Sequence, residues 1–183
     1  MSAPLLDGQL LDRAARSRDV THAAGEQRDG WIAANVLDFI AQVSLLFGML
    51  EVGEAAMTAG PGVAYLWRDS AGGAPLRLSS EQYVARFGAW CEALVRSGAE
   101  FSADVGEDFP PHFVAVATCV CTRIFRIYAH IYHHHFEQVV RLGAEPHLNT
   151  CFRHFADFVR AYQLVDSSER VALAGVLGVL DAC

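Results

Sequence analysis

One long amphipathic stretch constrains the fold more strongly than any other part of this sequence. Apolar side chains recur at helical spacing after Pro110-Pro111, and Gly143 and Pro146 follow the last of them. Proline is tolerated in the first turn of a helix, whereas a glycine and a following proline mark a helix end. The sequence therefore predicts one long helix from Pro111 to about Leu142.

Two stripes of side chains run along this predicted helix. At about 100° per residue, one stripe is polar and consists of Arg123, Arg126, His130, His133 and Glu137. The other stripe is expected to be buried and consists of Ile124, Tyr128, Ile131 and His135. The arginines suit an anion, and the histidines suit a metal ion. Taken alone, however, arginines at such positions are more often partners in surface ion pairs.

The rest of the chain indicates an all-α helical bundle. Further helices are expected over residues 31–50, 79–96, 149–164 and 171–180, and Ser79 with Gln82 fits a capping box. Residues 63–67 and 75–78 flank a Gly-rich turn, which predicts a small β-hairpin. We divide the chain into a short variable N-terminal arm, residues 1–30, and a single helical domain, residues 31–183.

Composition excludes several classes of function. The chain has 183 residues, 52% of them hydrophobic and 19% charged, and a net charge of −7. Nucleic-acid binding in general requires a basic surface, so it is not expected. Neither a signal peptide nor a run of about 20 apolar residues is evident. We therefore expect no membrane span, and we expect the chain in the cytoplasm. The five cysteines are expected to be reduced, with Cys119 and Cys121 as core thiols.

Several segments, in order, resemble the Mob (Mob/phocein) family of helical kinase adaptors. They are Trp31-Ile-Ala-Ala-Asn-Val-Leu-Asp-Phe39, Leu45-Leu-Phe-Gly48, Met57-Thr-Ala-Gly-Pro61, Phe109-Pro110, the stretch from Arg123 to Phe136, and His147-Leu-Asn-Thr150. The resemblance implies a core four-helix bundle with flanking helices. It also implies a non-enzymatic coactivator of NDR/LATS-type AGC kinases in cell division or morphogenesis, located in the cytoplasm, with the nucleus and cytokinetic structures as further sites.

A kinase-binding surface is the first site that the resemblance implies. In the family, an acidic and apolar patch on the first long helix takes the basic N-terminal regulatory region of the kinase. The matching residues here are Glu26, Trp31 and Asp38. Gly30 and Gln27 replace acidic residues of the family, so the patch has less negative charge to attract a basic segment.

A phosphate-binding pocket is the second implied site. The family's basic cluster, which binds a phosphothreonine segment of an upstream kinase or scaffold, maps to Thr122, Arg123 and Arg126. Threonine stands where the family often has lysine. Two arginines can still hold a phosphate through bidentate, charge-assisted hydrogen bonds, although weaker affinity or altered specificity is expected.

A structural zinc ion is the third implied feature, and here the sequence departs most from the family. The family's zinc histidines map to His130 and His135, but the loop over residues 49–56 contains no cysteine. Without two thiolates, zinc lacks half of its ligands. Loss of zinc is favoured over replacement of the thiolates by Glu51 or Glu54. On a straight helix, moreover, His130 and His135 lie about 140° apart, and His133 or His134 is the easier partner for His130.

Two other functions remain as alternatives. The first is a divergent Mob-fold scaffold or phosphopeptide-binding subunit that no longer activates a kinase. The second is a zinc hydrolase built on the histidines, which is disfavoured because the sequence has no His-Glu-x-x-His motif and no evident general base.

Overall fold

Helices make up most of the structure. The computed structural model describes residues 26–69, 73–98, 101 and 109–181. The helices are α2 (Glu26–Gly48), α3 (Ser80–Ser97), α4 (Phe113–His130), α5 (Phe136–Arg141), α6 (Glu145–Ala161), α7 (Ser167–Arg170) and α8 (Ala174–Asp181), with a π-helical turn at Ile131–His135 and a 3-10 turn at Val171–Leu173. The predicted all-α fold is confirmed. Helix α2 begins at Glu26, within the stretch that we assigned to the N-terminal arm.

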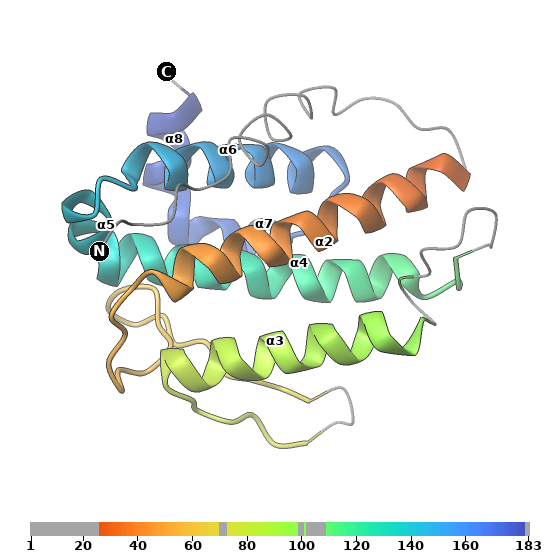
Figure 1. Ribbon diagram of the computed structural model, residues 1–183, viewed down its shortest axis with the longest axis horizontal. Coiled ribbons are helices and arrows are strands. Elements are labelled where there is room, and N and C mark those ends of the chain that lie inside the picture. The colour runs from red at the N-terminus through yellow and green to blue at the C-terminus, as the bar shows by residue number, and fades with distance from the viewer. Residues whose placement is uncertain (1–25, 70–72, 99–100, 102–108, 182–183) are drawn as a thin grey trace, which may run out of the picture.

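Four long helices form the core of the bundle. In Figure 1, α4 lies in the centre beside α3, while α2 crosses obliquely between this pair and α6. The ring of Phe39 on α2 lies 5.2 Å from Phe155 and 5.3 Å from Phe158 on α6. The ring of Tyr128 on α4 lies 5.1 Å from that of Phe152. Aromatic side chains therefore connect the central helix and α2 to α6.

The buried face of α4 agrees with the predicted stripe. Ile124, Tyr128 and Ile131 are fully buried, and His135 is half-buried. The N-terminal end of α3 is also as predicted, because Ser79 and Gln82 form both hydrogen bonds of a capping box. Helical spacing thus predicted the buried face of α4, and the cap residues predicted where α3 begins.

The predicted β-hairpin is not formed within the described residues. Trp67 and Leu76 exchange two backbone hydrogen bonds of 2.9 and 2.8 Å, but this antiparallel bridge is isolated. Where the next pair of a hairpin would form, Met57 intervenes: its N–H donates to Leu78 and its carbonyl accepts from Tyr65. The loop that follows α2 therefore takes the hydrogen bonds that a two-stranded hairpin would have used.

Two segments have the length and hydropathy of a membrane-spanning helix, namely Arg28–Gly48 and Phe113–Arg141. They coincide with α2 and with α4 through α5, whose apolar residues form the core. The core helices of folded proteins pass the same test of length and hydropathy, because they carry the same apolar residues as membrane spans. The absence of a membrane span stays a prediction.

Candidate functional site

A pocket of about 450 Å³ lies between α4 and the loop that precedes α3. It is lined by Ala64, Tyr65, Leu66, Arg68, Thr118, Cys119, Thr122, Arg123 and Arg126. All three residues of the predicted phosphate cluster are therefore brought together. Their spacing on one helix explains this result, since residues three or four apart share a face.

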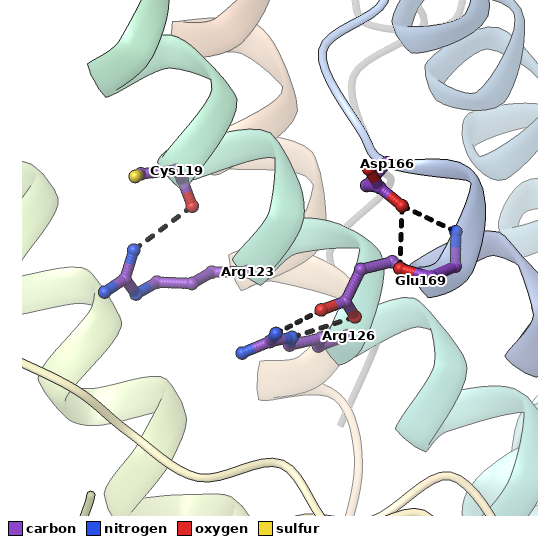
Figure 2. Close-up of polar contacts among 6 residues, drawn as sticks. Cys119, Arg123, Arg126, Asp166 and Glu169 are labelled. Atoms are coloured by element: carbon purple, nitrogen blue, oxygen red, sulfur yellow. Dashed lines mark hydrogen bonds and ion pairs between the residues drawn. The ribbon is translucent and has the colours of Figure 1, made fainter.

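Arg123 is fixed at the pocket wall by two tryptophans. Its guanidinium carbon lies 4.6 Å from the ring centroid of Trp67 and 4.4 Å from that of Trp90. The same group donates hydrogen bonds to the backbone carbonyls of Cys119, at 3.2 Å, and Arg68, at 3.1 Å. Figure 2 shows the bond to Cys119. Cation–π contacts and carbonyl bonds thus hold the positive charge in one orientation.

Arg126 is paired with an acid that sequence reasoning missed. Its guanidinium donates two hydrogen bonds to the carboxylate of Glu169 on α7, one of them 3.1 Å long from Nε (Figure 2). Burial alone would lower the pKa of Arg126, but the hydrogen bonds to Glu169 raise it overall. Arg126 therefore forms the ion pair that we considered as the alternative to an anion site, and it also lines the pocket. Glu169 is distant in sequence, so no local pattern could have revealed it.

Two further pocket residues also escaped sequence reasoning. Arg68 is exposed and reaches the pocket from the loop, and Cys119 is exposed rather than part of the core. The expectation of a core thiol was thus wrong for Cys119 and right for Cys121, which is buried. Helical spacing relative to Arg123 could have identified Cys119, whereas nothing in the sequence connects Arg68 to α4.

Among the histidines of α4 and the π-helical turn, His130 and His134 contact the loop that precedes α3, and none of these histidines lines the pocket. Nδ1 of His130 donates to the carbonyl of Thr58 at 2.9 Å, and Nε2 of His134 lies 2.8 Å from the Thr58 hydroxyl. The Nε2 of His133 lies 3.0 Å from the carbonyl of Ala172. His130 is 1% exposed, so its predicted place in the polar stripe was wrong. Burial lowers its pKa to about 4, and the residue is therefore neutral at pH 7.

The π-helical turn explains how the two family histidines meet. A π-helix makes hydrogen bonds from residue i to residue i+5, so residues five apart approach one face. The rings of His130 and His135 are accordingly 5.1 Å apart between centroids. The straight-helix estimate of their separation was wrong, because no pattern in the sequence indicates the π-helical turn.

These histidines do not complete a zinc site. Among the described residues, no group of three or more histidine, cysteine or acidic side chains is placed to hold a metal ion. Glu51 and Glu54 are exposed. A structural zinc ion needs four ligands. The bond of His130 Nδ1 to Thr58 leaves Nε2 of the same ring free to bind a metal, but the loop has no cysteine and the exposed Glu51 and Glu54 do not complete the donor set. The residues therefore do not fit the family's zinc.

The predicted kinase-binding residues lie on α2, near α6. Trp31 is half-buried against the core, and Asp38 is exposed two helical turns further on. Glu26 is the first residue of α2, but its side chain lies outside the described residues. The charges of Asp38 and of Asp157 on α6 both act on His154. Asp157 is a second acid that acts on the same imidazole, and it is itself paired with Arg160 at 2.9 Å.

Comparisons with known proteins agree with these features. The model of a family described as the Mob1/phocein family matches residues 11–173. The chain is 38% identical over 151 residues to MOB kinase activator 3C of Homo sapiens, covering 79% of this chain and 70% of that one. It is 40% identical over 155 residues to MOB kinase activator-like 1B of Arabidopsis thaliana, covering 81% and 72%.

Proposed function

Since the chain belongs to the Mob1/phocein family and is a kinase-activating adaptor rather than an enzyme, we propose that its partner is an NDR/LATS-type AGC kinase. The proposed contact is the N-terminal regulatory region of the kinase, in signalling that controls cell division or morphogenesis. The observation that carries the proposal is the position of Asp38, exposed on α2 two helical turns beyond the half-buried Trp31.

The charge on this surface suits a basic helix. Asp38 supplies an exposed carboxylate on α2, and Trp31 adds an apolar contact two turns away, whereas Asp157 on α6 is already paired with Arg160. Complementary charge speeds association and sets register, while a half-buried aromatic ring supplies contact area. We also propose Glu26, the first residue of α2, as a kinase-binding residue on the family resemblance alone.

Charge reversal on α2 tests this contact. Binding of the chain to an NDR-type regulatory segment is measured by isothermal titration calorimetry for the wild type, Asp38→Arg and Glu81→Arg. Glu81 is exposed in the first turn of α3, so its variant carries the same change in net charge at a distant position. We expect only Asp38→Arg to weaken binding, by about tenfold. Equal affinities for all three proteins would exclude the α2 surface.

We propose, second, that the pocket beside α4 binds a phosphothreonine segment of an upstream kinase or scaffold. Arg123 and Arg126 supply planar guanidinium groups that match phosphate oxygens, and Thr122 supplies a hydroxyl. Arg123→Ala is expected to abolish binding of a phosphothreonine peptide while leaving the affinity for the kinase segment unchanged. If phosphopeptide binds but no kinase segment does, the chain is instead a scaffold subunit without kinase activation.

We propose, third, that the chain needs no zinc and resides in the cytoplasm, with the nucleus and cytokinetic structures as further sites. What supports the absence of a zinc requirement is the bonding of His130 and His134 to Thr58, which ties the loop to the helix end without metal. Fluorescence microscopy of the tagged chain through the cell cycle tests the location.

A further inference from the structure

We propose that Arg68 is the residue that captures the phosphate group in the pocket beside α4. This inference rests on the phosphothreonine site proposed above and adds a residue from outside the helix to it. It follows from the charged side chains that line the pocket and from the hydrogen bonds and ion pairs that each of them already makes.

The charge and part of the hydrogen-bonding capacity of the two helix arginines already serve other groups. Arg123 stacks between Trp67 and Trp90 and gives one hydrogen bond to each of two backbone carbonyls. Arg126 directs Nε and one terminal nitrogen at Glu169, whose charge offsets its own. A phosphate that approached these two residues alone would meet one net positive charge and a competing carboxylate.

The Arg68 side chain has no such partners among the described residues. It is exposed, and its guanidinium makes no hydrogen bond or ion pair with any other residue that the structure describes. The adjacent acid, Asp69, accepts a 2.8 Å hydrogen bond from the Trp67 indole and lies 4.0 Å from Arg86. Both carboxylate oxygens of Asp69 thus have partners other than the Arg68 guanidinium.

The backbone of Arg68 is fixed beside the pocket even though its side chain is free. Its carbonyl accepts the 3.1 Å bond from Arg123, and Trp67, the preceding residue, stacks on the same guanidinium. Because the backbone is already fixed, Arg68 can bind a phosphate at the cost of ordering its own side chain alone. Because guanidinium is a planar fork, it can bind two phosphate oxygens at once.

A nuclear magnetic resonance titration tests the proposal. The probe is an alanine-flanked phosphothreonine peptide, with the unphosphorylated peptide as reference. The chain has three tryptophans, so its indole N–H signals report directly on the site. Trp67 and Trp90 flank Arg123 in the pocket wall, whereas Trp31 on α2 serves as the internal control. The proteins compared are the wild type, Arg68→Ala, Arg68→Lys and Arg77→Ala, the last being an exposed arginine outside the pocket lining.

Phosphopeptide is expected to shift the signals of Trp67 and Trp90 in the wild type and in Arg77→Ala with equal affinity. Arg68→Ala should bind about tenfold more weakly, and Arg68→Lys should be intermediate because it keeps the charge but loses the fork. Unchanged affinity in Arg68→Ala would overturn the role of Arg68 while leaving the phosphate site in place. No shift in the wild type would overturn both.

Discussion

At the scale of single residues, the chain holds its functional charges in place with aromatic rings. Arg123 lies between two tryptophans and Arg126 lies 5.2 Å from the ring centroid of Tyr65. Each such contact contributes about 0.5–2 kcal/mol, depending on its exposure. Because the guanidinium groups are ordered before a ligand arrives, binding carries a smaller cost in conformational entropy. The pocket is therefore organised in the absence of its ligand.

Gly60 is a residue whose replacement is expected to be costly. Its φ of +77° is unfavourable for other residues, and an added Cβ would lie 3.2 Å from Nδ1 of His133. Gly62 is the matched control, because its φ is +82° but its Cβ would meet nothing within 4 Å. We expect Gly62→Ala to lower the free energy of unfolding by about 1 kcal/mol and Gly60→Ala by roughly 2 kcal/mol or more. Urea denaturation measures both, and equal losses would show that His133 does not constrain this loop.

At the scale of elements, local sequence predicted the helices well and the contacts between segments poorly. The apolar spacing of α2 and α4 and the Ser79–Gln82 box concern neighbours within one helix, so they can be read directly. The same holds for Thr122, Arg123 and Arg126. Contacts such as Arg126 with Glu169, or Met57 between Tyr65 and Leu78, depend on tertiary packing that no local pattern encodes.

The cap of α3 gives a quantitative test at this scale. Gln82 N–H donates to the Ser79 hydroxyl at 3.2 Å, and the Gln82 side chain accepts from the Ser79 N–H at 3.2 Å. Removing the hydroxyl in Ser79→Ala is expected to lower stability by about 1 kcal/mol. Ser79→Asp should be nearly neutral, because aspartate caps helices equally well. Thermal denaturation of the three proteins checks this, and a loss in Ser79→Asp equal to that in Ser79→Ala would contradict it.

The loop that precedes α3 gives a second test. The hydrogen bonds of Thr58 to His130 and His134 join this loop to the end of α4. Since no described group of three metal-ligating side chains supports zinc, EDTA is expected to leave the melting temperature unchanged. Mass spectrometry of the purified chain should find less than stoichiometric metal. A lower melting temperature after chelation, restored by zinc, would contradict the proposal.

At the scale of the whole molecule, half-buried histidines should make stability depend on pH. Burial lowers the pKa of His147 and His154 below the usual value, although the charges of Asp157 and Asp38 partly counteract this for His154. In the unfolded chain both residues take up protons at a higher pH than in the folded one. The free energy of unfolding is therefore fully retained above the unfolded pKa, near 6.5, and falls as pH decreases towards 5.

Replacing one of these histidines isolates its share of the effect. The ring of His154 packs against Phe39, with centroids 5.0 Å apart, so His154→Phe preserves an aromatic contact while removing the titrating group. Chemical denaturation between pH 5 and 7 should show a shallower loss of stability in His154→Phe than in the wild type. Parallel pH profiles would mean that His154 is not the source.

The family places this chain among kinase-activating adaptors, and the exposed residues of α2 are where we propose that it meets its kinase. The most direct measurement of this claim is the phosphotransfer rate of a full-length NDR/LATS-type kinase with increasing amounts of the wild-type chain or Asp38→Arg. The account predicts a saturable rise in rate with the wild type and a rise only at higher concentrations with Asp38→Arg. A rate that does not change at saturating wild-type protein, or an identical response to both proteins, would contradict it.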